Sequence, residues 1–153
     1  MSDKQLHLVR HGEVHNPEGV LYGRLPNYRL SELGEQMAEA AAQELAASDR
    51  EVSRIIASPL ERARQSAAPI ALAFNLPIDI DERIIEPTNA FEGTVGRSAF
   101  KNPRYWYRYL NPFRPSWGEP YRSIATRVRE AMNDAWDADR EGDIVMVSHQ
   151  AVV

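Results

Sequence analysis

Residues 143–149 read DIVMVSH, and the positions from 144 to 147 are all apolar. A strand with one exposed face alternates apolar and polar residues. A central strand of a parallel sheet is covered on both faces and is apolar throughout. The run therefore predicts a central parallel strand in an α/β domain.

Working outward from this strand, the rest of the chain alternates between strand-like and helix-like segments. Short apolar runs at 5–9, 52–58 and 76–80 predict three more strands, and helical patterns cover 31–47, 60–74 and 119–140. Strands that alternate with helices are typical of βαβ units. We therefore expect an α/β three-layer sandwich, with a mostly parallel central sheet flanked by helices.

The helical segments carry their own signals. Ser31 is a candidate N-cap for the first helix, and Pro69 predicts a kink or an early break in the second. The first helix is expected to bury one face through Leu33, Met37, Ala40, Ala41 and Leu45. The last is expected to bury Ile124, Val128, Ala131, Met132 and Ala135.

Composition limits the class of protein. With 153 residues, of which 43% are hydrophobic, the chain is long enough for one domain with a real core. A net charge of -4 argues against nucleic-acid or membrane binding, because both need surplus basic charge. The chain has no cysteine, and no stretch of it has the hydrophobicity of a signal peptide or a membrane span. We expect a single cytoplasmic domain over 1–153.

The segment 100–120 differs from the rest. It is rich in proline, arginine and aromatic residues. One interpretation is a loop that packs its aromatic side chains on the domain surface. The other is a lid insertion over an active site.

Charged and polar residues follow the predicted strands. In open α/β sheets, ligands bind outside the carboxyl ends of the strands. Two guanidinium groups, two imidazoles and a helix N-terminus at one such edge would suit a doubly charged anion, and phosphate is the natural candidate. The residues placed there are Arg10, His11, Ser58, Arg62 and His149, with Glu86 a few positions after the third strand.

Three histidines, His7, His11 and His15, are spaced four apart. On a helix this spacing would suggest a metal site. Here the histidines span a predicted strand and the loop that begins at Gly12, so they cannot share a face. We expect no metal and no cofactor.

Four blocks of sequence carry a family resemblance. LVRHGE at 8–13 matches an Arg-His-Gly signature, and SPLERARQSA at 58–67 matches a second block in which Ser66 stands where threonine is usual. GEPYRSIATRV at 118–128 resembles a Gly-Glu-Ser segment, and VMVSHQ at 145–150 resembles a terminal Ser-His-Gly with Gln150 in place of glycine. In this order the blocks resemble the histidine phosphatase superfamily, in its phosphoglycerate mutase-like branch.

The resemblance implies roles for individual residues. His11 would be the nucleophile that forms a phosphohistidine, with a backbone carbonyl near Gly12 fixing its tautomer. Arg10, Arg62 and His149 would bind the phosphoryl oxygens, with Asn16 as a further ligand. Glu86 is the first choice for the proton donor, and Glu92 and Glu13 are the alternatives.

The resemblance also suggests contacts to the rest of the substrate. Tyr22 and Arg24 lie in a stretch that the family places near the pocket, and Trp106 and Trp117 lie in the aromatic segment. We expect a small phosphorylated metabolite as partner. The oligomeric state is left open, a dimer being one option. The chain stops at Val153, where relatives would continue into at least one more helix.

The expected activity is metal-independent hydrolysis of phosphomonoesters. Two alternatives stay open: a phosphoglycerate mutase-like phosphotransferase, and a phosphoryl-ligand binding module with weak or no turnover. A plain interaction protein is a further alternative, but it would not explain why both arginines and both histidines are present.

Overall fold

The computed structural model describes residues 4–96, 98–109, 117–138 and 141–153. Four parallel strands form one sheet in the order β1-β4-β2-β3. Their bounds are Leu6–Arg10 for β1, Val52–Ala57 for β2, Ile78–Ile80 for β3 and Asp143–Ser148 for β4. Every residue of β4 is buried between β1 and β2, which confirms the predicted central strand.

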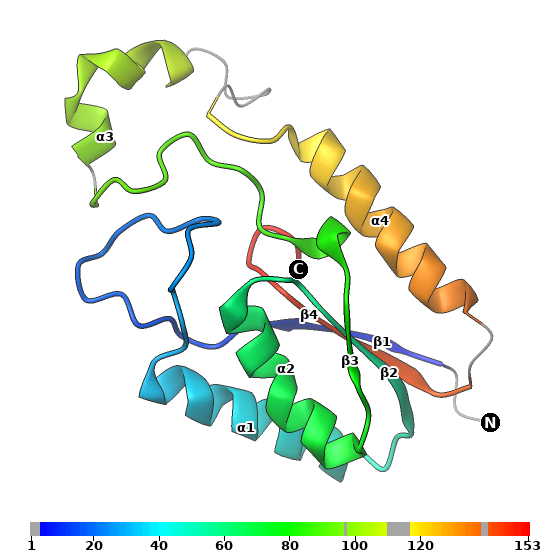
Figure 1. Ribbon diagram of the computed structural model, residues 1–153. Helices are drawn as coiled ribbons and strands as arrows, with labels where there is room; N and C mark the ends of the chain where they lie inside the picture. Colours follow the sequence, from blue (N-terminus) through cyan, green and yellow to red (C-terminus); the bar gives the residue numbers. More distant parts are fainter. Residues whose placement is uncertain (1–3, 97, 110–116, 139–140) are drawn as a thin grey trace.

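Helices cover both faces of this sheet, so the three-layer sandwich is confirmed. Helices α1 (Glu32–Ala47) and α2 (Glu61–Phe74) lie on one face, and α4 (Tyr121–Asp137) lies on the other (Figure 1). Strand residues alternate between two cores: Ile55 and Val145 pack with α1 and α2, whereas Ile56 and Met146 pack with α4. Shorter helices are η1 (Glu82–Ile84), α3 (Ser98–Lys101) and η2 (Pro103–Tyr109).

The strand order explains why the helices divide in this way. The connections through α1 and α2 move across the sheet in one direction, and the connection through α4 moves back. Because parallel crossovers are right-handed, opposite directions place their helices on opposite faces.

The predicted buried face of α1 is wrong by about one position. Gly34, Ala38 and Ala42 are buried, whereas Leu33 and Met37 are 51% and 49% exposed. The reason is a backbone contact at the start of the helix, where a Cβ on Gly34 would lie 2.0 Å from the Glu13 carbonyl oxygen. Small residues allow α1 to approach this loop and α2 closely, and this approach fixes its rotation.

The predicted early break at Pro69 is also wrong, because α2 continues to Phe74. Proline inside a helix removes one backbone hydrogen bond. The inner face of α2 is fully buried at Ala63, Ala67 and Ile70, and this packing holds the helix together across Pro69.

The other helix predictions agree with the structure. The Ser31 hydroxyl accepts a hydrogen bond from the Gly34 N–H and caps α1. Four of the five predicted positions of α4 are buried, and Met132 is partly buried against the same core.

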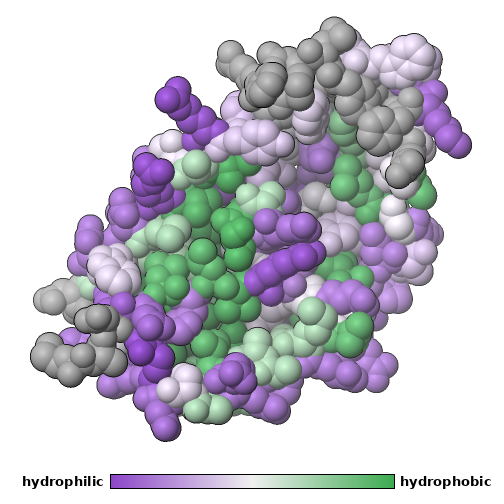
Figure 2. All heavy atoms as spheres, turned by 180° about the vertical axis from the view of Figure 1, so that it is seen from behind, coloured by the Kyte–Doolittle hydropathy of each residue, from purple (hydrophilic) through white to green (hydrophobic). Residues whose placement is uncertain are grey.

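Strand β1 lies at an edge of the described sheet. It pairs with β4 on one side only, within the described residues, and Leu8 is 40% exposed. Figure 2 shows a broad apolar surface on the side of the molecule that faces away from the viewer in Figure 1. A groove on α4 has a volume of about 370 Å³ and is lined mostly by apolar residues, among them Ile124, Met132 and Val152.

A buried acid joins strands at the amino end of the sheet. Asp143 accepts hydrogen bonds from the Gln5 N–H and from the Arg50 guanidinium, and its Oδ2 lies 2.7 Å from His7 Nε2. The Arg50 hydrogen bonds and the His7 contact hold the pKa of Asp143 well below its usual range. His7 therefore sits at the opposite end of the sheet from His11, and His15 is exposed.

Two further expectations concern the membrane and the lid. Within the described part of the chain, no helix has the length and apolar character needed to cross a membrane. Of the suggested lid at 100–120, residues 110–116 lie outside the described residues.

Candidate active site

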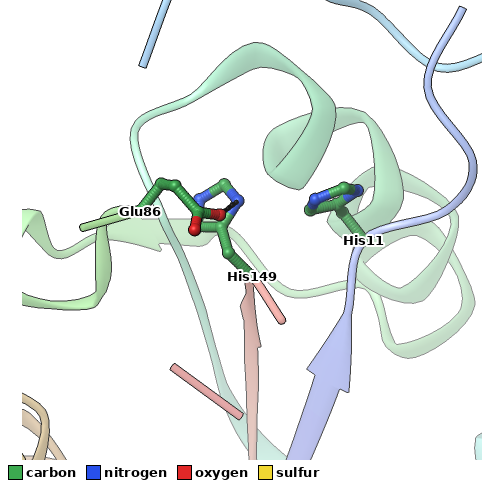
Figure 3. A group of neighbouring side chains, drawn as sticks. All are labelled: His11, Glu86 and His149. Atoms are coloured by element: carbon green, nitrogen blue, oxygen red, sulfur yellow. Dashed lines mark ion pairs between the residues drawn. The ribbon is translucent and has the colours of Figure 1, made fainter. Parts of the chain in front are cut away.

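The ends of β1 and β4 bring two histidines together. Arg10 is paired with Ser148 in the sheet, so the next residues, His11 and His149, leave the two strands side by side. Their rings are 5.1 Å apart at the centroids and meet at 63°. Figure 3 shows both rings at the strand ends, with Glu86 beside His149.

His11 is held as a neutral imidazole. Its Nδ1 lies 2.7 Å from the Gly12 carbonyl oxygen, so Nδ1–H donates and the lone pair is on Nε2. Burial lowers the pKa of His11 to about 4, with Arg62 and Arg10 lowering it further and the Gly12 hydrogen bond opposing them. The backbone carbonyl expected to fix the tautomer is therefore the one at Gly12.

The loop that carries this carbonyl is fixed by Ser66 and by α1. The Gly12 N–H donates to Ser66 Oγ at 3.0 Å, and the Ser66 hydroxyl donates to the Arg62 carbonyl at 2.9 Å. A Cβ on Gly12 would lie 2.3 Å from the Gly34 carbonyl oxygen, so only glycine fits here. Ser66 is a positioning residue that sequence reasoning noted only as a replacement for threonine.

Arg62 is a buried cation at the first turn of α2. Only 1% of the residue is exposed, and its guanidinium donates to the Gly23 carbonyl at 2.7 Å. Its Nε is 3.4 Å from His11 Nε2, and its carbon Cζ lies 4.8 Å from the centroid of the Tyr22 ring. These contacts fix the guanidinium beside His11 Nε2.

Glu86 is the acid nearest to both histidines. Its Oε2 lies 3.3 Å from His149 Nδ1 and 4.0 Å from the Arg62 guanidinium. Burial raises the pKa of Glu86, although Arg62 and Arg10 oppose this. The segment is held in place because the Ser148 hydroxyl donates to the Ile84 carbonyl at 2.6 Å.

His149 is fully buried and neutral. Its Nε2 lies 2.7 Å from Ser58 Oγ, whereas Nδ1 has no hydrogen-bond partner among the described residues. Burial, together with the charge of Arg62, lowers the pKa of His149 far below its ordinary value. Because His149 is neutral, the approach to Glu86 marked in Figure 3 is a contact rather than an ion pair.

A pocket of about 370 Å³ lies beside these side chains, and Arg62 and His149 are not among the residues that line it. Of the predicted site residues, Arg10, His11, Tyr22, Glu86 and Trp117 line it. Other lining residues, to which sequence reasoning gave no role, include Thr88, Asn89, Tyr121 and Gln150. Tyr121 and Gln150 lie inside two of the blocks that carry the family resemblance, whereas nothing in the local sequence of Thr88 and Asn89 marks them.

Comparisons with known proteins show the family to which the chain belongs. The family model of the histidine phosphatase superfamily (branch 1) matches residues 6–153. The chain belongs to this superfamily. A Mycobacterium tuberculosis protein, Rv0525, is 48% identical over 99% of this chain and 75% of its own length; it is uncharacterised.

Two further similar proteins are named for an enzyme activity. A 2,3-bisphosphoglycerate-dependent phosphoglycerate mutase of Thermoplasma acidophilum is 36% identical over 93% of this chain and 68% of its own length. The solved structure of a mycobacterial glucosyl-3-phosphoglycerate phosphatase in complex with VO3 has a TM-score of 0.79 and 25% identity, and covers 98% of this chain and 78% of the other.

Within this histidine phosphatase fold, the two alternative proton donors lie elsewhere. Glu92 accepts a hydrogen bond from the Arg24 N–H, and Glu13 accepts one from the Ser31 hydroxyl. Both acids therefore order loops, and of the three candidates Glu86 is the one beside His149.

The remaining predicted ligands are placed differently from one another. Asn16 lies beside a second hollow that Arg10 and His11 also line, but its side-chain amide bonds to the backbone of Val20. Arg24 donates to the Glu86 carbonyl and so positions that acid. Trp106 is 59% exposed and is not among the residues that line the pocket.

The donor atoms of His11, Glu86 and His149 all lie within 4.8 Å of one another, as the ligands of a metal ion would. The Arg62 guanidinium, however, lies 3.4 Å from one of these atoms and 4.0 Å from another. A cation so close favours an anion between the donors and opposes a divalent metal.

Proposed function

We propose that this protein hydrolyses small phosphomonoesters without a metal ion, through a phosphohistidine formed on His11. The observation that carries the proposal is the neutral His11 imidazole, whose lone pair is on Nε2 because Nδ1 bonds to Gly12. A neutral imidazole beside a buried guanidinium suits attack on a phosphoryl group.

In the first step, His11 Nε2 forms a bond to phosphorus while the bond to the ester oxygen breaks. Arg10 and Arg62 neutralise the phosphoryl oxygens. Glu86 enters this step in its protonated form, which burial favours by raising its pKa, and gives its proton to the leaving oxygen. The products of this step are an alcohol, a phosphohistidine and the Glu86 carboxylate.

In the second step, water attacks the phosphohistidine. The Glu86 carboxylate takes a proton from the water as its oxygen bonds to phosphorus, and the bond from His11 Nε2 to phosphorus breaks. Inorganic phosphate leaves, His11 is neutral again and Glu86 is again protonated. Every proton is thus accounted for by groups already in the pocket.

The test separates the nucleophile from the acid. We expect chelator-resistant hydrolysis of an aryl phosphate, an acid-labile phosphoryl label on His11, and no turnover in His11→Ala. Glu86→Gln should lose about 100-fold or more in kcat with an alkyl phosphate, and much less with p-nitrophenyl phosphate, whose leaving group needs no proton.

Glu92→Gln is the matched control. It should leave the ratio of the kcat values for the two substrates unchanged. An equal loss on both substrates in Glu86→Gln would remove Glu86 from the acid role. Phosphate binding without turnover in the wild type would instead indicate a binding module.

A mutase activity is the second candidate, because the Thermoplasma relative is a phosphoglycerate mutase. A mutase must keep its phosphohistidine from water until an acceptor arrives. A phosphohistidine that outlives many hydrolytic turnovers, and that passes its phosphoryl group to a phosphoglycerate, would favour this candidate over the phosphatase.

The pocket walls suggest a substrate with an apolar or sugar-like body. Trp117 and Tyr22 line the same pocket as Arg10 and His11, whereas Trp106 does not line it. Trp117→Ala should change the ranking of phosphomonoesters by kcat/KM, and Trp106→Ala should not. An unchanged ranking in Trp117→Ala would contradict this choice of substrate class.

A further inference from the structure

Ser58 lies behind His149, on the side away from the pocket. It follows β2 directly, and none of its surface is exposed. Its Oγ is 2.7 Å from His149 Nε2, and the Leu60 N–H donates to the same oxygen at 3.4 Å.

The direction of these hydrogen bonds can be worked out from the donors. The Leu60 N–H can only donate, so it occupies a lone pair of Ser58 Oγ. The remaining acceptor near the Ser58 hydroxyl proton, within the described chain, is His149 Nε2. A buried hydroxyl with no acceptor is costly, so the hydroxyl donates to Nε2.

We propose that Ser58 is a positioning residue that holds neutral His149 in its Nδ1–H tautomer, and so turns a hydrogen-bond donor toward the phosphoryl group. With Nε2 accepting from Ser58, the single ring proton is on Nδ1. That atom is fully buried, has no hydrogen-bond partner among the described residues and faces Glu86.

This inference rests on the proposed function for its catalytic consequence. An imidazole that binds phosphoryl oxygens must present N–H, and a lone pair facing those oxygens would repel them. Because burial lowers the pKa of His149, protonation of the ring cannot supply this donor near neutral pH. The tautomer has to supply it instead.

The opposite tautomer of His149, with the proton on Nε2, leads to a different expectation. If Nε2 carried the proton, the Ser58 hydroxyl would lose its acceptor, and a lone pair on Nδ1 would face Glu86, which lines the pocket. The two arrangements differ only in where one proton lies, and the nitrogen resonances of the ring report this directly.

The experiment combines imidazole nitrogen NMR with kinetics. In protein free of phosphate, His149 is expected to show protonated Nδ1 and unprotonated Nε2. Ser58→Ala should shift the population toward Nε2–H, lower kcat by about 100-fold as loss of one oxyanion donor does, and weaken inhibition by inorganic phosphate. Ser58→Thr keeps the hydroxyl and should restore all three readouts.

Ser53→Ala is the matched control, because Ser53 lies in β2 and bonds to the Asp143 carbonyl far from the pocket. An Nε2–H tautomer in the wild type, or an unchanged tautomer in Ser58→Ala, would overturn the inference whatever the enzyme does. Absence of turnover in a wild type that shows the Nδ1–H tautomer would overturn the proposed function instead.

Discussion

At the scale of single residues, the site depends on a guanidinium that folding has already buried. Arg62 touches the Gly23 carbonyl, the Tyr22 ring and His11, with Glu86 at 4.0 Å. Its planar fork can satisfy a backbone carbonyl and point at the pocket at the same time. A lysine ammonium is a single point charge and cannot do both.

We therefore expect Arg62→Lys to lower kcat/KM for a phosphomonoester by about 100-fold, the loss typical of one oxyanion donor. Steady-state kinetics on the purified protein would measure this. Arg64→Lys is the control, because Arg64 is on the same helix and exposed to solvent. Equal losses in the two variants would show that the guanidinium geometry at position 62 is unimportant.

The placement of most candidate site residues could be predicted at this scale, because they lie at strand ends that the apolar runs reveal. Arg10, His11, Arg62 and His149 meet as expected. The choice among three acids could not be predicted from spacing, because it depends on contacts between distant segments. The role of Arg24 was missed for the same reason, since it grips the backbone of Glu86, 62 positions away.

At the scale of secondary structure, α1 and the loop after β1 meet through backbone atoms. Gly12 and Gly34 leave no room for a Cβ on either side. The predicted face of α1 was wrong because hydrophobicity favoured Leu33 and Met37, whereas this contact required the smallest residues. The close approach of α1 to the loop after β1 determines the rotation of the helix. An analysis of hydrophobic patterns does not detect such a backbone contact.

Gly34→Ala tests this contact. Alanine ordinarily stabilises a helix by about 1 kcal/mol relative to glycine. Here its Cβ would lie 2.0 Å from the Glu13 carbonyl oxygen. The cost of overpacking, about 1–3 kcal/mol, should exceed the gain in helix propensity. The loop that holds His11 should also shift. We expect a lower Tm and a lower kcat.

Gln36→Ala is on the exposed side of the same helix and should change neither quantity. Thermal unfolding and steady-state kinetics would measure both variants. A Gly34→Ala protein that is more stable and fully active would show that the contact relaxes without cost.

At the scale of the whole molecule, two buried neutral histidines couple stability to pH. Burial lowers the pKa of His11 to about 4 and that of His149 further. The unfolded chain takes up these protons near pH 6.5, so the stability they contribute is complete above that pH and declines as pH falls toward the folded pKa values.

By pH 5 the free energy of unfolding should fall by about 2 kcal/mol for each histidine. The raised pKa of Glu86 acts in the opposite direction and offsets part of this loss. Urea unfolding at pH 7.5 and at pH 5 would measure the difference. A His11→Asn, His149→Asn double variant should lose most of it, and exposed His15→Asn should not. If the double variant showed the same difference in unfolding free energy between pH 7.5 and pH 5 as the wild type, His11 and His149 would not be its source.

The burial of Arg62 also has a consequence for the kinetics of binding. Its water was removed when the chain folded, and its contacts with Gly23 and Tyr22 hold the guanidinium in a fixed orientation. A phosphate that binds therefore has to lose the water around itself, but little water has to leave Arg62. Capture should be governed by diffusion and by the local positive field, rather than by a slow rearrangement of the cation.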